Sequence, residues 1–180
     1  MNGIINVYKE RGFTSHDVVA KLRGILHMKK IGHTGTLDPD ATGVLPVCIG
    51  KATKVCGLLT DKDKTYRAVV KLGVITNTED MTGEILAKHP VSVTKEQIEW
   101  AVSKFVGEIE QVPPMYSAIK INGKKLYELA RQGKEVERKA RKVTIYGIKV
   151  LSIDFSENEF TIEVSCSKGT VSYTHLRAHE

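Results

Sequence analysis

The chain has 180 residues, 41% of them hydrophobic and 27% charged, which are the proportions of a folded globular protein and exclude a disordered or fibrous one. Its 27 basic and 21 acidic side chains give a net charge of +6, which is compatible with a nucleic-acid partner but does not require one. No apolar run approaches the length of a membrane span and the first residues do not resemble a signal peptide, so we expect a cytoplasmic protein without a membrane partner.

The first fifty residues predict two strands, a helix and a long loop. Ile4–Val7 is a short apolar run typical of a strand, and Thr14 or Ser15 is placed to cap a helix. The apolar face of this helix would consist of Val18, Val19, Leu22, Ile25 and Leu26. Residues 29–43 are rich in Gly, Thr and Pro without a sustained period, which predicts a structured loop of the kind that often carries a site. Val44–Ile49 predicts a buried strand.

Between residues 66 and 107 the pattern changes from a strand to a helix. Residues 66–72 alternate between Tyr66, Ala68, Val70 and Leu72 on one face and a partly basic face on the other, which predicts a strand. Thr94 and Gln97 have the spacing of a capping box and predict the start of a helix that Gly107 would end. The core face of that helix would consist of Ile98, Ala101, Val102 and Phe105.

Residues 107–142 form a strongly basic segment, within which the run Val112-Pro113-Pro114 breaks the chain. Its basic side chains are Lys120, Lys124, Lys125, Arg131, Lys134, Arg138, Lys139, Arg141 and Lys142. A short helix is expected around Leu126–Arg131, ending at Gly133. A positive cluster of this kind is either a solvated surface or a contact for RNA phosphates.

Two paired strands are expected after this segment, over residues 143–152 and 160–166. The second would bury Phe160, Ile162, Val164 and Cys166 on one face. Because strands and helices mix without regular βαβ alternation, the sequence predicts an α+β fold with a mainly antiparallel sheet.

The spacing of the residues does not match the known sequence motifs for binding zinc, calcium or phosphate. The three cysteines include no CxxC pair, which argues against a disulfide framework or a structural zinc site. A calcium loop that starts at Asp38 would need Glu where the chain has Ile49, and a phosphate-binding loop would need Gly and Ser/Thr where it has Leu45 and Ala52. Asp38 and Asp40 could hold Mg²⁺, but no third acidic ligand follows. We therefore expect no metal.

Asp38 precedes Pro39, which favours an extended backbone at the aspartate. In the simplest interpretation the two residues form an Asp-Pro turn in which the carboxylate accepts hydrogen bonds from nearby backbone N–H groups. The residues alone leave this structural role and a catalytic role open.

The segment GHTGTLDPDATGVLPVCIGKATK, residues 32–54, resembles the signature of TruB-type tRNA pseudouridine synthases. The similarity continues through Asp63–Arg67, Val112–Lys120, Gly123–Tyr127, Ala130–Gly133 and Cys166–Thr170. The resemblance implies the pseudouridine synthase catalytic fold over residues 1–170, with a mainly antiparallel mixed sheet flanked by helices and a basic thumb insertion at about 107–142. No segment of the chain resembles the family's C-terminal RNA-binding domain, which we expect to be absent.

The resemblance further implies the reaction. A uridine at position 55 of tRNA, in the T-loop, would be flipped out, detached from ribose C1′ and rejoined through C5, without a cofactor or metal. The partner would be the T-arm stem-loop of tRNA, and the protein would act as a monomer.

Site residues follow from the same resemblance. Asp38 matches the essential aspartate, as nucleophile or as electrostatic and acid/base partner, so we expect Asp40 to face solvent or to form a turn. His33 matches the histidine that fills the space of the flipped base, and Tyr66 the tyrosine that stacks on the uracil. Without the resemblance, a surface histidine and a strand aromatic are the simpler interpretations. RNA contacts are expected from Lys9, Lys120, Lys124 and Lys125.

The chain departs from the family in two places. Lys9 is followed by Glu10 where the family has proline, a difference that the turn at Gly12 and Ser15 should tolerate. After Thr170 the family continues with Tyr, an apolar residue and an Arg that pairs with the catalytic Asp. Here the same places hold Val171, Ser172 and Tyr173, and Arg177 is out of register. A phenol cannot supply a fixed positive charge.

From this departure we expect little or no activity from the 180-residue chain. We also expect an uncovered apolar face at Phe160, Ile162 and Val164, because the family's downstream elements are missing. The alternative function is therefore a tRNA-binding module without catalysis. A metal-dependent phosphotransferase that uses Asp38 and Asp40 is a third, distant possibility.

Overall fold

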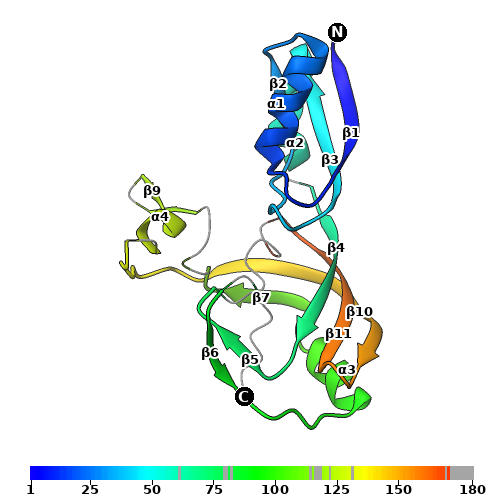
Figure 1. Ribbon diagram of the computed structural model, residues 1–180, viewed down its shortest axis with the longest axis vertical. Coiled ribbons are helices and arrows are strands. Elements are labelled where there is room, and N and C mark those ends of the chain that lie inside the picture. Colours follow the sequence, from blue (N-terminus) through cyan, green and yellow to red (C-terminus); the bar gives the residue numbers. More distant parts are fainter. Residues whose placement is uncertain are drawn as a thin grey trace. The chain divides into compact units, whose positions relative to one another are not determined.

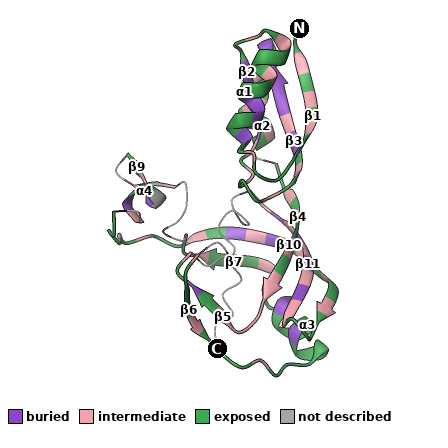
Figure 2. Cartoon of the chain, in the orientation of Figure 1, coloured by how far each residue is buried: buried purple, intermediate pink, exposed green. Residues whose placement is uncertain are grey.

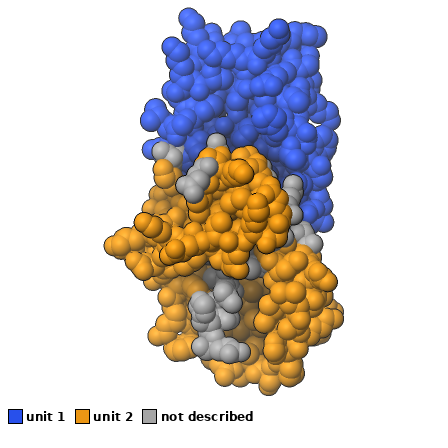
Figure 3. All heavy atoms as spheres, turned by 90° about the vertical axis from the view of Figure 1, so that its left-hand side faces the viewer, with its two compact units in different colours: residues 1–62 blue, residues 63–180 orange. Residues whose placement is uncertain are grey.

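The computed structural model describes residues 1–60, 62–78, 81, 83–113, 115, 119–121, 123–130, 132–168 and 170. The chain divides into two compact units, Met1–Lys62 and Asp63–Glu180, which are coloured separately in Figure 3. Each of these units has its own hydrophobic core. No helix in the described ranges is both long and apolar enough to cross a membrane.

The first unit is a three-stranded antiparallel sheet in the order β1-β3-β2, with α1 packed against it (Figure 1). Its elements are β1 (Gly3–Lys9), α1 (Ser15–Leu26), β2 (Ile31–His33), β3 (Gly43–Ile49), the 3₁₀ helix η1 (Gly50–Val55) and α2 (Cys56–Thr60). Its core consists of Val18, Val19, Ile31, Leu45 and Val47. The predicted strands at 4–7 and 44–49 and the predicted helix are confirmed.

Thr14, rather than Ser15, caps α1. Its side chain accepts a hydrogen bond from the N–H of Asp17, whose carboxylate in turn accepts one from the N–H of Thr14, so that the first turn is closed by a capping box. The predicted apolar face is one residue too wide, because Ile25, in the last turn, is 66% exposed.

β2 lies inside the segment that the sequence predicted as loop. It pairs residue by residue with β3, from Ile31 opposite Ile49 to His33 opposite Val47. Three residues are too few to show a period of two, so only the pairing with β3 defines this strand.

The second unit contains a four-stranded antiparallel sheet in the order β4-β11-β10-β7. Its elements are β4 (Lys64–Lys71), β5 (Val74–Thr76), β6 (Ile85–Lys88), α3 (Lys95–Ser103), β7 (Gly107–Gln111), β8 (Lys120–Ile121), β9 (Lys124–Lys125), α4 (Leu126–Ala130), β10 (Arg141–Asp154) and β11 (Glu159–Cys166). The pairs β5–β6 and β8–β9 form separate two-stranded sheets. The predicted α+β class with antiparallel pairing is confirmed, although the strands form separate sheets.

One face of the four-stranded sheet is the core of the second unit. Phe160, Ile162 and Val164 of β11 are buried together with Ile98 and Val102 of α3 (Figure 2). The expectation that this face of β11 would be uncovered is therefore wrong, because α3 supplies the apolar partners that we assigned to missing downstream elements.

The capping box of Thr94 and Gln97 at the start of α3 is confirmed. The helix ends at Ser103, earlier than predicted, and Gly107 instead opens β7 with a φ of +118°. β7 pairs with the first part of β10, so residues 107–111 belong to the sheet rather than to an insertion. The basic segment leaves the sheet after Gln111 and returns to it at Arg141.

Candidate functional site

The loop that carries Asp38 joins β2 to β3 in the first unit. Leu37 packs against the core of this unit, and the Asp38 side chain is exposed. The carbonyl of Asp38 accepts a hydrogen bond of 3.1 Å from the N–H of Ala41, so a turn does follow the aspartate. Among the described residues none binds the Asp38 carboxylate. The predicted Asp-Pro turn is thus present in the backbone, but the Asp38 carboxylate accepts from the described residues none of the hydrogen bonds that would stabilise it.

Hydrogen bonds from the segment 9–15 fix the backbone on both sides of Asp38. The Ser15 hydroxyl accepts from the N–H of Leu37 at 2.9 Å and contacts the Leu37 carbonyl at 3.4 Å. The carbonyl of Pro39 accepts from the N–H of Gly12 at 2.8 Å and from the ammonium of Lys9 at 3.2 Å. An exposed carboxylate therefore sits between two anchored residues, an arrangement suited to aim a reactive group.

Lys9 is fully buried at the end of β1, with 0% exposure. Besides Pro39, its ammonium donates to the main-chain carbonyls of Phe13 at 2.7 Å and Glu10 at 3.0 Å. All three N–H donors of a lysine are thereby used. The expectation that Lys9 contacts RNA is corrected: its charge faces carbonyl groups inside the protein and is not available to a phosphate.

A sequence signal for this role was present. Ile5, Val7 and Lys9 alternate along β1 on its inward face, so the period of two already places the lysine among apolar residues. A buried lysine requires polar partners, which here are the turn and the loop of Asp38. Ser15 carried no comparable signal, since its acceptor and donor lie 22 residues away.

Asp40 is exposed like Asp38, and its main-chain carbonyl accepts a hydrogen bond of 3.3 Å from the guanidinium of Arg11. Asp40 shares the anchored neighbour Pro39 with Asp38, but its other neighbour, Ala41, donates to the carbonyl of Asp38 rather than to the segment 9–15. Among the described residues no group of three acidic, histidine or cysteine side chains gathers as a metal ion would need.

His33 is the last residue of β2 and is half-buried. Its Nδ1 lies 2.7 Å from the carbonyl oxygen of Gly35. Because a carbonyl oxygen only accepts, Nδ1 carries the hydrogen in this contact, and Nε2 is the acceptor of the neutral ring. The same bond holds the ring against the start of the Asp38 loop.

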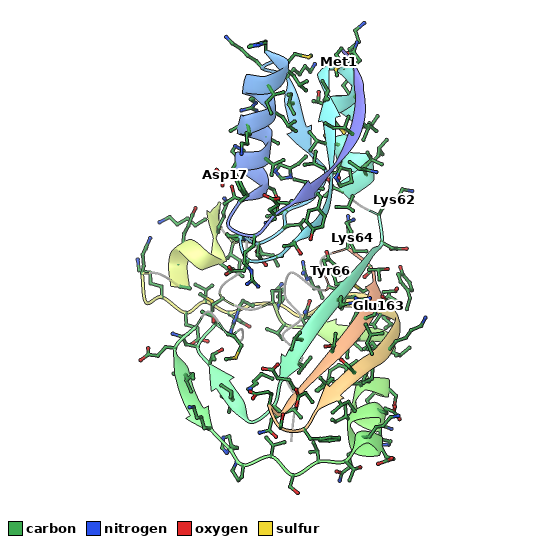
Figure 4. All side chains as sticks on the ribbon, turned by 45° about the vertical axis from the view of Figure 1, so that its right-hand side comes forward. Met1, Asp17, Lys62, Lys64, Tyr66 and Glu163 are labelled. Carbon is green, nitrogen blue, oxygen red and sulfur yellow. The ribbon has the colours of Figure 1, made fainter. Side chains whose placement is uncertain are left out.

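Tyr66 belongs to the second unit, on β4, opposite Val164 of β11. Its half-buried ring packs against the core of the sheet, and Figure 4 labels it together with Glu163 on the neighbouring strand. The other face of β4, which the sequence predicted as basic, is neutralised: Arg67 pairs with Glu163 at 3.8 Å and Lys71 with Glu159 at 3.1 Å. That face is an ion-pair surface rather than a free positive one.

The small hairpin of β8 and β9 carries Lys120, Lys124 and Lys125, and in its register Lys120 stands opposite Lys125. Lys124 is exposed, and the N–H of Lys125 donates to the carboxylate of Glu128 in α4 at 3.3 Å. The hairpin therefore gathers three basic residues of the basic segment at one place. Tyr116 and the residues 171–180, including Tyr173 and Arg177, lie outside the described residues.

A hollow of about 420 Å³ lies in the same basic segment. Its lining is Pro113, Ile119, Ile121, Leu126, Glu137, Arg138, Lys139 and Arg141. The position of one of its basic side chains, Arg138, is fixed, because its guanidinium donates to the carbonyl of Pro113 at 3.3 Å and pairs with Glu135 at 3.2 Å.

The chain is similar to the proteins of one family over most of its length. Residues 23–172 match the family described as TruB family pseudouridylate synthase, N-terminal domain. The tRNA pseudouridine synthase B of Lachnoclostridium phytofermentans is 64% identical over 176 residues, covering 94% of this chain and 57% of that protein. The enzyme of the same name from Alkaliphilus oremlandii is 59% identical over 170 residues, covering 94% and 56%. The chain thus spans little more than half the length of these relatives.

A solved structure with the same fold is that of a Cbf5-Nop10-Gar1 complex. It matches with a TM-score of 0.70 and 34% identity over 93% of this chain and 40% of the other chain. A second, an H/ACA RNP bound to a substrate RNA containing 2′-deoxyuridine, matches with a TM-score of 0.64 and 29% identity, covering 93% and 38%.

Proposed function

The chain belongs to the TruB family of pseudouridylate synthases, and from this premise we propose that it carries the catalytic site of an enzyme that isomerises a uridine in the T-loop of tRNA to pseudouridine, with Asp38 as the catalytic residue and an arginine after Thr170 required for turnover. The observation that carries the proposal is the exposed carboxylate of Asp38 between Leu37 and Pro39, both of which are hydrogen-bonded to the segment 9–15. Relatives named tRNA pseudouridine synthase B support the substrate, and the solved RNP with a bound RNA supports an RNA ligand.

The chemistry requires no external reactant. The bond between C1′ and N1 breaks, a bond between C1′ and C5 forms, C5 loses a proton, and N1 gains one. Asp38 serves this cycle from the ribose side, as nucleophile or as base, and either role requires a carboxylate that is held in place. Because the backbone on each side of Asp38 is fixed, few rotatable bonds remain between the protein scaffold and the carboxylate.

The target base must leave its stack before Asp38 can act on its ribose. We assign His33 to the place that the base vacates, since its planar ring is held by Gly35 and offers a face for stacking. Tyr66 stacks on the uracil and passes the C5 proton, and the hairpin with Lys120, Lys124 and Lys125 binds the phosphates of the T-arm.

A second function, tRNA binding without isomerisation, is favoured by one observation. Among the described residues no cation accompanies the Asp38 carboxylate, and Tyr173 stands where the family has the arginine partner. An arginine would favour the ionised aspartate and orient it through paired N–H donors.

Tritium release from tRNA labelled at uridine C5 separates the two functions. We expect none from the 180-residue chain, and release from a chimaera in which the downstream part of the Lachnoclostridium phytofermentans enzyme follows Thr170. In this chimaera, Asp38→Asn should abolish release while binding tRNA nearly as tightly, and the matched variant Asp40→Asn should keep most activity. If the Asp40 variant were inactive and the Asp38 variant active, the assignment of Asp38 as the catalytic residue would be refuted. Full turnover by the 180-residue chain would show that no arginine partner is needed.

A further inference from the structure

Two histidine rings meet where α1 begins. His16, the second residue of α1, and His33, at the end of β2, have ring centroids 6.2 Å apart and planes at 85° to one another. This is an edge-to-face arrangement within the range of separations at which aromatic rings attract. The two residues are 17 positions apart in the sequence, so the contact depends on the packing of α1 against the sheet.

One hydrogen bond does not fix the plane of the His33 ring. The bond from Nδ1 to the Gly35 carbonyl holds one edge of the imidazole, and the ring can still tilt about that contact. The His16 ring supplies a second point of contact, at an angle of 85° to the first ring. Two contacts in different directions define the orientation of a planar group, where one does not.

His16 has a fixed backbone although its side chain is exposed. It lies between buried Ser15, which is hydrogen-bonded to Leu37, and Asp17, which closes the capping box with Thr14. Asp17 marks this turn of the helix in Figure 4. The same first turn therefore anchors the Asp38 loop through Ser15 and contacts the His33 ring through His16.

We propose that His16 is a positioning residue for His33, which it holds in the orientation that stacks in the T-loop of the RNA. The proposal rests on the function proposed above for His33. It assigns to the first turn of α1 a role in RNA recognition in addition to its role in fixing the Asp38 loop.

The ring contact is tested in the free 180-residue protein by nuclear magnetic resonance. In the parent we expect cross-relaxation between the ring protons of His16 and His33, and a long-range nitrogen-15 spectrum in which neutral His33 carries its hydrogen on Nδ1. His16→Ala should shift the His33 ring signals and mix its tautomers, and His16→Phe should restore the parent pattern. The control is His27→Asn, an exposed histidine in a left-handed conformation that asparagine tolerates. Identical His33 signals in the parent and in His16→Ala overturn the proposal.

Binding of a T-arm hairpin RNA tests the consequence. His16→Ala should raise Kd about three- to tenfold, the range expected from one aromatic contact, and His16→Phe should stay within about twofold of the parent. The double variant His16→Ala/His33→Ala should bind no more weakly than His33→Ala alone. Additive losses would mean that His16 contacts RNA on its own, which refutes a positioning role. A parent protein that does not bind the hairpin would refute the proposed function instead, and the spectra would still decide the ring contact.

Discussion

The ammonium of Lys9 donates a hydrogen bond of 3.2 Å to the main-chain carbonyl of Pro39, thirty residues along the chain. The lysine is fully buried, and its other two hydrogen bonds close the turn between β1 and α1. One side chain thus joins the end of a strand, the start of a helix and the residue after the proposed catalytic aspartate. We therefore expect both the stability of the first unit and the activity of the site to depend on Lys9.

Lys9→Met should lower the free energy of unfolding by about 2–4 kcal/mol, because it leaves buried carbonyls without a donor. It should also reduce turnover in the chimaera through a looser Asp38 loop. Urea unfolding and tritium release measure the two effects, and exposed Lys30→Met serves as the control. If Lys9 bound phosphate instead, the variant would unfold like the parent and would lower the salt dependence of RNA binding.

Asp17→Ala should destabilise α1 at neutral pH. The hydrogen bonds from the side chain and backbone of Thr14, and then the charge of His16, hold the pKa of the Asp17 carboxyl below its ordinary value of 3.8. A carboxyl with a lowered pKa stabilises the fold fully above its unfolded-state pKa and loses that contribution as pH falls through the folded-state value.

The difference in Tm between the parent and Asp17→Ala should therefore be largest above pH 3.8 and should shrink as the pH is lowered further. Thermal unfolding followed by circular dichroism across this range measures it. A difference that grows in acid would contradict the capping role of the ionised carboxylate.

Tyr66→Phe should bind T-arm RNA like the parent but lose turnover in the chimaera, because it keeps a stacking ring and removes the hydroxyl. Tyr66→Leu should weaken both RNA binding and turnover, because it removes a stacking ring that contributes roughly 1–3 kcal/mol to binding. Since Tyr66 also packs against the core of the second unit, thermal stability must be measured in parallel. Equal turnover by the Phe variant and the parent would leave Tyr66 a stacking role only.

Lys124→Ala/Lys125→Ala should reduce the salt dependence of RNA binding. Each lost phosphate contact lowers the slope of log K against log salt by roughly 0.7–0.9, so the pair should lower it by up to about two. The control, Lys95→Ala/Lys104→Ala, removes equal charge from α3 and its C-cap, where Lys95 pairs with Glu99 and Lys104 lies over Trp100. Equal slopes in both variants would mean that the hairpin does not touch phosphate.

Local patterns of the sequence determined most of the elements. The helices α1 and α3 and the strands β4 and β11 lie where apolar residues repeat with the period of their element, and β1 and β3 lie on short apolar runs. Such a repeat places the apolar side chains on one face of the element, and that face is buried whichever element covers it. The helix caps at Thr14 and Thr94 were also predictable, because each bonds to a residue only three positions away. The proposed roles of Asp38 and His33 likewise come from the resemblance on residues 32–54 alone.

Only the tertiary structure decided what holds that site. β2 is too short to show a period and β7 has a single apolar side chain, Ile109, so each is defined by its hydrogen bonds to a longer strand. The sequence placed Lys9 on a buried face but could not show its acceptor at Pro39, and it showed neither the bond from Ser15 to Leu37 nor the contact between His16 and His33. These contacts join segments that lie far apart along the chain, and their geometry exists only after α1 has packed against the sheet.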